Sequence, residues 1–175
     1  MIYGFLETPV GRLLVARDTT GVRLIHFDGP AKGGPAKGGP AKAGPCVRKR
    51  FRPAAGWERH DRAFDDVATQ LKEYFDGRRR VFELPLAPEG TPFQLRVWNA
   101  LIEIPYGETI SYGELAARIG DRSASRAVGL ANGSNPLPIV IPCHRVIGSN
   151  GKLTGYGGGL PIKQQLLTLE RGSLW

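Results

Sequence analysis

The chain has 175 residues, enough for one domain or two small ones, and 41% of them are hydrophobic, enough to bury a core. No apolar run approaches the roughly 18 residues of a membrane span, and no basic stretch precedes an apolar one at the N-terminus, so we expect a cytoplasmic protein with no membrane contact. The net charge of +8 suits a polyanion, although +6 falls in residues 1–88 (16 Lys and Arg, 10 Asp and Glu) and +2 in residues 89–175 (8 and 6).

The first part of the chain, residues 2–27, is expected to form a strand meander. Residues 2–6, 13–16 and 22–27 are rich in β-formers, and Gly, Pro and Asp separate them. Short β-rich runs between turn residues are typical of hairpins.

A single strong helix is predicted over residues 63–76. Its apolar residues recur at spacings of three and four, which gives one buried face. They are Phe64, Val67, Ala68, Leu71, Tyr74 and Phe75. Gly77 is well placed to end the helix, and residues 81–90 read as an extended linker.

Residues 29–45 are of low complexity, with two Ala-Lys-Gly-Gly-Pro repeats and no apolar residue larger than Ala. Such a segment cannot contribute to a core, and we expect a flexible insertion over about residues 29–50. Two interpretations stay open. The insertion is a solubilising surface loop, or it makes sliding contacts with phosphates through Arg48, Lys49, Arg50 and Arg52.

The second half predicts three helices. Thr91-Pro92-Phe93-Gln94 and Ser111-Tyr112-Gly113-Glu114 are both capping boxes, and they open helices that run to about Ile104 and Ile119. A short turn at 120–123 leads to a third helix, about Ala124 to Asn132. Two short helices joined by a Gly-containing turn are the sequence form of a helix-turn-helix.

The third helix is rich in small residues, including Ser125, Ala127 and Gly129. Either it packs tightly on a neighbouring helix, or it enters a narrow groove. Arg118, Arg122 and Arg126 recur every four residues and could form a strip that faces phosphates.

Cys143 is the most distinctive candidate nucleophile. Residues 135–142 contain three prolines and predict a stiff, extended approach, and glycines dominate the segment that follows. A free thiol is mostly protonated at neutral pH, so a base would have to activate it. His144 is adjacent, but neighbours on an extended backbone point to opposite faces, and contact would need a turn or a bridging water. Two cysteines and three scattered histidines predict neither a disulfide framework nor a metal site.

The segment Pro142-Cys143-His144-Arg145-Val146 resembles the active-site signature of the O6-alkylguanine-DNA alkyltransferases, the methylated-DNA–protein-cysteine methyltransferases. Further motifs match the family in order from about Gln70 to Glu170. They are Phe93 to Trp98, Ile104 to Thr109, Ser111-Tyr112-Gly113, Arg126 to Gly129, Ala131-Asn132, Asn135-Pro136, Gly155-Tyr156 and Leu166-Leu167.

The resemblance implies an α+β fold with two domains. A ribonuclease-H-like domain would span residues 1–88, and a winged-helix-like domain with a helix-turn-helix would span residues 89–175 and carry the active-site cysteine. It also implies a protein that acts as a monomer without a cofactor or metal, on double-stranded and single-stranded DNA bearing alkylated bases.

The resemblance also implies roles for individual residues. Cys143 would accept the alkyl group, His144 would act as a base through a water, and Glu170 would orient His144. Glu170 could instead be an ordinary surface carboxylate. Asn135 would brace the active-site loop, and Tyr112 would help rotate the nucleotide and protonate the departing guanine.

The remaining implied roles concern DNA. Arg126 would fill the space that the flipped base leaves. Other residues implied to contact the DNA are Ser125, Ala127, Gly129 and Arg122. The base pocket would comprise Tyr156, Gly157, Gly158 and Val146.

The implied reaction is direct-reversal repair. The base is extruded from the duplex, and the alkyl group passes from O6 of guanine to Cys143 in one irreversible turnover. O4-alkylthymine is a candidate second substrate.

The sequence departs from the family pattern at three places. Gly157 stands where many relatives have Ala or Ser, Ser123 stands where a proline is usual, and the insertion at 29–45 is additional. Three other interpretations are compatible with parts of the sequence. They are an alkyltransferase-like DNA-binding protein, which would lack Cys143, a helix-turn-helix regulator, and a cysteine hydrolase.

Overall fold

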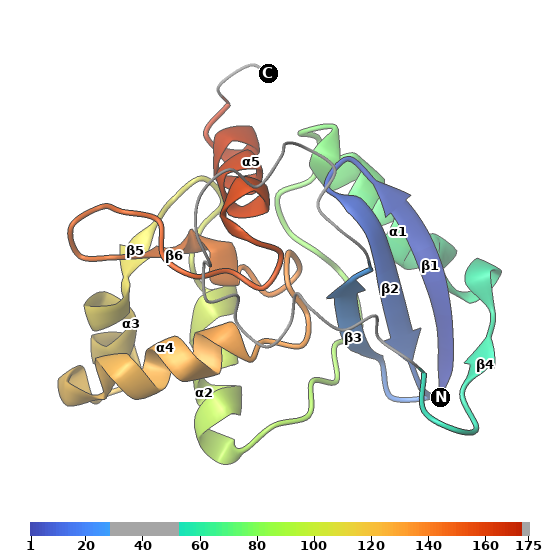
Figure 1. Ribbon diagram of the computed structural model, residues 1–175, viewed down its shortest axis with the longest axis horizontal. Helices are drawn as coiled ribbons and strands as arrows, with labels where there is room; N and C mark the ends of the chain where they lie inside the picture. Colours follow the sequence, from blue (N-terminus) through green and yellow to red (C-terminus); the bar gives the residue numbers. More distant parts are fainter. Residues whose placement is uncertain (29–52, 173–175) are drawn as a thin grey trace, which may run out of the picture.

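The computed structural model describes residues 1–28 and 53–172, so the predicted insertion at 29–50 lies outside the described residues (Figure 1). The N-terminal part is built on a sheet of strands β1 (Ile2–Thr8), β2 (Gly11–Arg17), β3 (Val22–Phe27) and β4 (Glu58–Arg59). The sheet order is β3-β2-β1-β4, with antiparallel pairing of β1, β2 and β3 and parallel pairing of β1 with β4. The predicted strand meander is therefore confirmed.

One helical segment packs beside this sheet. The short η1 (Asp61–Phe64) leads into α1 (Asp65–Phe75), close to the predicted bounds. Val67, Leu71 and Tyr74 are buried at spacings of four and three, as an amphipathic helix requires. The chain leaves α1 through Gly77, which has a φ of +72°.

The C-terminal part is mainly helical. Its elements are α2 (Pro92–Ile102), β5 (Ile110–Ser111), α3 (Tyr112–Arg118), η2 (Arg122–Ala124), α4 (Ser125–Gly133), η3 (Cys143–Arg145), β6 (Val146–Ile147) and α5 (Leu160–Glu170). Both predicted capping boxes are present, with Thr91 and Ser111 accepting from the backbone N–H three residues on. Helices α3 and α4 form the predicted helix-turn-helix.

The prediction of an extended segment over residues 135–142 was wrong. Ile141 N–H donates to the Leu137 carbonyl at 2.8 Å, which closes a turn, and Ile139 lies at a φ of +76°. Prolines disfavour the interior of a helix but are common in turns, and this turn brings the chain back toward α4.

The two parts meet along β3 (Figure 1). Ile25 N–H donates to the Pro136 carbonyl at 2.8 Å, and Val22 exchanges hydrogen bonds with Pro85 and Ala87 of the linker. A Cβ at Gly21 would lie 2.3 Å from the Pro85 carbonyl oxygen, so this approach requires glycine. Edge strand β3 thus holds both the linker and the loop before Cys143.

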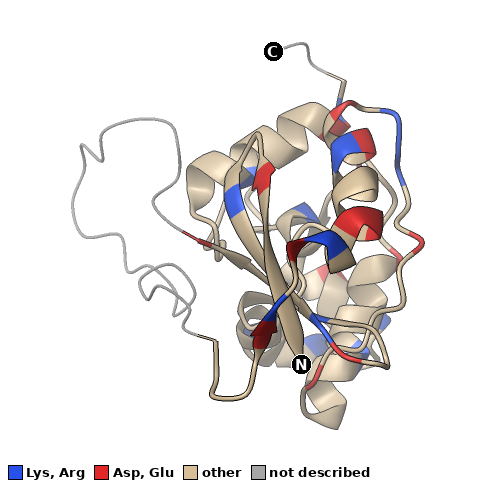
Figure 2. Cartoon of the chain, turned by 90° about the vertical axis from the view of Figure 1, so that its right-hand side faces the viewer, with Lys and Arg blue, Asp and Glu red and all other residues tan. Residues whose placement is uncertain are grey.

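Charged residues are mixed on the side of the sheet and α1, where Figure 2 shows basic and acidic groups interspersed. Arg17 pairs with Asp66 at 3.0 Å, and Arg79 pairs with Glu73 at 2.7 Å.

Within the described residues, no helix is long and apolar enough to cross a membrane.

Candidate active site

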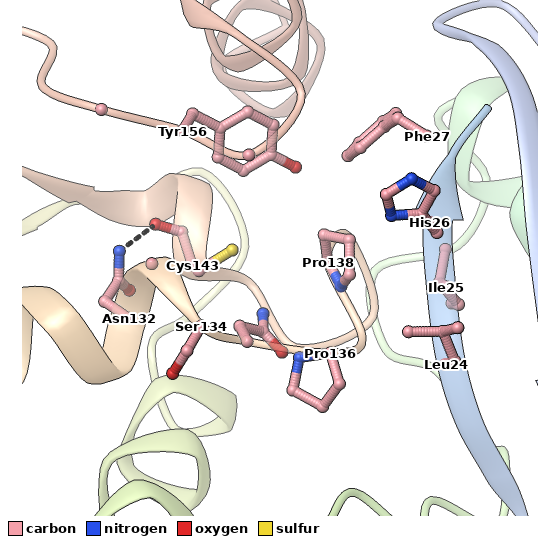
Figure 3. A pocket seen from close by; sticks show the side chains of 14 residues that line it. Leu24, Ile25, His26, Phe27, Asn132, Ser134, Pro136, Pro138, Cys143 and Tyr156 are labelled. Carbon is pink, nitrogen blue, oxygen red and sulfur yellow. Dashed lines mark hydrogen bonds between the residues drawn. The ribbon is translucent and has the colours of Figure 1, made fainter. Parts of the chain in front are cut away.

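Cys143 opens the 3-10 turn η3 and is only 5% exposed. Its N–H donates to the Ile141 carbonyl at 2.8 Å, and its carbonyl accepts from Asn132 Nδ2 at 3.5 Å. In Figure 3 the Sγ atom points toward the space between Tyr156 and Pro138. The turn η3 is the local bend that adjacent Cys143 and His144 need in order to serve one site.

His144 is completely buried and is held by Glu170 of α5. Its Nε2 atom lies 2.9 Å from Glu170 Oε1, whereas Nδ1 has no hydrogen-bond partner among the described residues. The carboxylate accepts, so the network assigns the proton to Nε2 and a lone pair to Nδ1. Burial lowers the pKa of His144 below its ordinary value, against the opposing effect of Glu170. The imidazole is therefore neutral and ready to accept a proton.

Glu170 is 5% exposed, so it is not an ordinary surface carboxylate. Arg145 Nε donates to Oε2 at 2.8 Å, and Arg145 Nη2 donates to Oε1 at 2.9 Å. Gly107 N–H donates to Oε2 at 3.2 Å. Burial favours the neutral acid, but the hydrogen bonds and charges of His144 and Arg145 outweigh it and lower the pKa of Glu170 to about 2. Glu170 is thus a permanent anion behind the imidazole.

Asn135 ties the two ends of the turn before Cys143. Its Nδ2 atom donates to the Ile141 carbonyl at 2.8 Å, and its Oδ1 atom accepts from Leu137 N–H at 2.9 Å. Both bonds are buried, and they compensate backbone groups that the turn leaves without a ladder partner.

A cavity of about 190 Å³ adjoins Cys143. One wall is the loop at Gly155, Tyr156 and Gly157, and the opposite wall is β3. The other lining residues come from the end of α4 and the turn that follows it (Figure 3). Val146 and Gly158 are buried but do not line this cavity. The Tyr156 hydroxyl is buried and has no hydrogen-bond partner among the described residues, so a polar ligand could supply one.

Tyr112 lies at the start of α3, above α4. Its hydroxyl accepts a hydrogen bond from Thr154 Oγ1 at 3.1 Å, and burial raises its pKa, so it stays protonated. A Cβ at Gly129 would lie 3.7 Å from the Tyr112 ring, so the two elements are in close contact.

The predicted DNA-binding residues lie on or next to α4, with different exposure. Arg122, Arg126 and Ala127 are exposed, whereas Ser125 and Gly129 are half-buried. Helix α4 also carries Leu130, a large apolar side chain that is 74% exposed. Helix α4 thus combines small residues with the long, exposed cation Arg126, and Gly129 of the same helix lies next to the Tyr112 ring.

Several residues of the site were not singled out from the sequence. Arg145 lies inside the recognised motif, but its partner Glu170 is 25 positions away. Lys163 is fully buried, and its ammonium donates to the Val146 carbonyl at 2.6 Å and to the Thr154 carbonyl at 3.1 Å. Burial lowers the pKa of Lys163 to about 8. Phe27 of β3 packs edge-on against Tyr156, with ring centroids 5.9 Å apart. The sequence signal that could have identified Lys163 is the presence of a charged lysine in an otherwise apolar helix.

Two family models match the chain. The ribonuclease-like domain of 6-O-methylguanine DNA methyltransferase matches residues 1–88, and the DNA-binding domain of the same family matches residues 92–172. A methylated-DNA–protein-cysteine methyltransferase of Methanosarcina acetivorans is 48% identical over 170 residues, covering 97% of this chain and 98% of the relative.

A second relative of the same name, from Mycolicibacterium paratuberculosis, is 57% identical over 126 residues, covering 71% of this chain and 76% of the relative. Among solved structures, Mycobacterium tuberculosis OGT in complex with DNA superposes with a TM-score of 0.82 at 42% identity, covering 98% of this chain and 93% of that one. The predicted fold class, a ribonuclease-like domain followed by a DNA-binding domain, is confirmed.

Proposed function

Because the chain belongs to the 6-O-methylguanine DNA methyltransferase family, we propose that it repairs DNA directly, by moving the alkyl group of O6-alkylguanine onto the sulfur of Cys143. The observation that supports this proposal most directly is the arrangement of Cys143, His144 and Glu170. A cysteine beside a cavity is followed by a buried imidazole, which a permanent carboxylate holds by a 2.9 Å hydrogen bond. This is the arrangement of an activated nucleophile, a base and an orienting group.

The chemical step is a displacement at carbon. His144 Nδ1 takes the thiol proton through a water, the sulfur forms a bond to the alkyl carbon, and the bond from that carbon to O6 breaks. The electron pair of the broken bond goes to guanine, and Tyr112 donates a proton to the leaving base. The product is a thioether that no neighbouring group can cleave, so each molecule reacts once.

Access to O6 requires that the nucleotide leave the duplex. Helix α4 presents small residues that let its backbone approach the minor groove, and exposed Arg126 is long enough to enter the stack. The extruded base then occupies the cavity between β3 and the loop at residues 155–157, where the Tyr156 hydroxyl lies. We propose duplex and single-stranded DNA as substrates and a monomer as the acting form, and O4-alkylthymine stays a candidate second substrate.

A titration of damaged DNA tests this function. Increasing amounts of duplex containing O6-methylguanine are incubated with a fixed amount of protein, and the restored guanine is counted. The proposal predicts a plateau at one guanine per protein molecule, and none for Cys143→Ala. Continued turnover beyond the plateau would indicate a hydrolase, and tight binding without restoration would indicate a DNA-binding protein.

A further inference from the structure

Tyr74 makes a hydrogen bond that the proposed reaction does not yet use. It lies on α1 and is fully buried, and its hydroxyl donates to Glu170 Oε1 at 2.7 Å. The two residues are 96 positions apart. Tyr74 belongs to the segment that matches the ribonuclease-like domain, whereas Glu170 belongs to the segment that matches the DNA-binding domain.

Glu170 Oε1 also accepts from His144. Its three donors are the Tyr74 hydroxyl, His144 Nε2 and Arg145 Nη2, at 2.7, 2.9 and 2.9 Å. Donors to one oxygen compete for its negative charge, and this competition is strong where water is absent. The Tyr74 hydroxyl therefore affects how strongly Glu170 supports a positive charge on His144.

The hydroxyl of Tyr74 stays protonated at neutral pH. Burial raises its pKa far above the ordinary value, and the neighbouring Glu170 charge raises it further, so Tyr74 remains a hydrogen-bond donor. Its ring is held by edge contacts with Phe75 and Tyr106, at centroid distances of 5.3 and 6.0 Å. The donor is thus fixed in both protonation and position.

We propose that Tyr74 is a positioning residue for alkyl transfer: its hydroxyl holds Glu170 and limits the basicity of His144, so that the N-terminal part of the chain sets the ionisation of Cys143. This inference rests on the proposed function of Cys143. It gives the ribonuclease-like part a chemical role through one hydrogen bond.

The direction of the effect follows from the charge on Oε1. Without the Tyr74 hydroxyl, more of that charge remains for His144, and the imidazolium becomes easier to form. A more basic imidazole takes the thiol proton more readily, so the Cys143 thiolate forms at lower pH. Other titratable or charged groups face this cluster and stay unchanged in the comparison. They are Arg145 beside Glu170, Tyr106 beside Tyr74, Arg80 beside Tyr106, and Tyr156 and Lys163 beside His144 and Cys143.

The test measures the pH at which Cys143 ionises, from the ultraviolet absorbance of the thiolate, in the full chain with Cys46→Ser so that one thiol remains. Tyr74→Phe is expected to lower the midpoint by about half to one pH unit, since one shared charged hydrogen bond is lost. The rate of benzyl transfer from free benzylguanine to Cys143 should fall as the pH is lowered, and the midpoint of this fall should shift by the same amount. Tyr106→Phe is the matched control, because among the described residues the Tyr106 hydroxyl donates to the Leu169 carbonyl, at 3.5 Å, and not to Glu170.

A midpoint that is the same in Tyr74→Phe and Tyr106→Phe would overturn the proposal and leave Tyr74 a packing residue. If Tyr74→Phe does not fold, a fluorinated tyrosine at position 74 keeps the shape and strengthens the donor. It is then expected to raise the midpoint, and no shift would overturn the proposal. Failure of the repair function itself would be visible separately, as an unaltered chain whose thiol ionises but accepts no alkyl group.

Discussion

Arg145 neutralises Glu170 inside the protein. Its guanidinium makes two hydrogen bonds to the carboxylate and one to the Ile104 carbonyl, and it is almost completely buried. Paired charges of this kind add little net stability, but removing one partner leaves the other unpaired in a region without water.

We therefore expect Arg145→Gln to lower the free energy of unfolding by about 3 kcal/mol, measured by urea denaturation. Arg145→Lys should recover only part of the loss, because lysine keeps the charge but lacks the two-pronged geometry. Arg118→Gln, at an exposed position on α3, is the control. Equal stability of Arg145→Gln and Arg118→Gln would contradict the structural role assigned to Arg145.

The lowered pKa of Glu170 predicts that the free energy of unfolding decreases in acid. Its folded pKa is about 2, against an ordinary value of 4.5. A carboxyl with a lowered pKa contributes stability above pH 4.5 and loses it as the pH falls toward 2. The free energy of unfolding of Glu170→Gln should therefore depend less on pH over this interval than that of the unaltered chain. Parallel curves for the two proteins would show that Glu170 is not held as an anion.

At the scale of elements, α5 supports the cavity through Lys163. The Lys163 ammonium bridges the carbonyls of Val146 on β6 and Thr154 before the glycine loop. Lys163→Met keeps the volume of the side chain but leaves both carbonyls without this donor, at a cost of about 2 kcal/mol. Amide hydrogen exchange over residues 154–158 should become faster and alkyl transfer slower. Lys152→Met, at an exposed position, should change neither, and unchanged exchange in Lys163→Met would refute the bridge.

Helix α4 is the element that we expect to meet DNA. Arg126→Ala should slow transfer from duplex O6-methylguanine about tenfold or more, because the cost of unstacking a base is no longer offset by the inserted side chain. Transfer from free benzylguanine, which needs no unstacking, should be nearly unchanged. Arg118→Ala provides the comparison on α3. Equal slowing with both substrates would argue against insertion of Arg126.

The sequence predicted the helices well because their ends carry local signals. The capping boxes at Thr91 and Ser111 and the glycine after α1 depend on neighbours within a few residues. The turn at residues 135–142 was mispredicted for two reasons. Its local bonds, from Leu137 N–H to the Asn135 side chain and from that side chain to Ile141, are of a kind that Asn makes in turns, and the prolines were read as extended instead. Its remaining support, the bond from Ile25 of β3 to the Pro136 carbonyl, is a tertiary contact with no local pattern.

At the scale of the whole molecule, the site is assembled from both parts of the chain. Cys143, His144 and Glu170 could be proposed from the resemblance to a family, and the structure brings them together. The contributions of Tyr74 and Phe27 could not be proposed, because they depend on how the first part of the chain packs against the second. Pairing across 96 residues leaves no trace in spacing or composition.

The basic excess of the molecule lies mainly in one segment. Residues 29–52 carry seven Lys and Arg and no Asp or Glu, so the rest of residues 1–88 has nine basic and ten acidic residues. We predict that deleting residues 30–45, which removes three lysines, leaves alkyl transfer intact. The salt dependence of DNA binding should become only slightly weaker, as measured by titration at several salt concentrations. A deletion variant without activity would count against the flexible-insertion hypothesis.

The mass of the peptide that contains Cys143 is the most direct test of the account. After incubation with duplex DNA bearing O6-methylguanine, the protein is digested and its two cysteine peptides are compared. We predict one added methyl group on the Cys143 peptide and none on the Cys46 peptide. A Cys143 peptide of unchanged mass, in a preparation that has restored guanine in the DNA, would contradict the assignment of Cys143 as the acceptor.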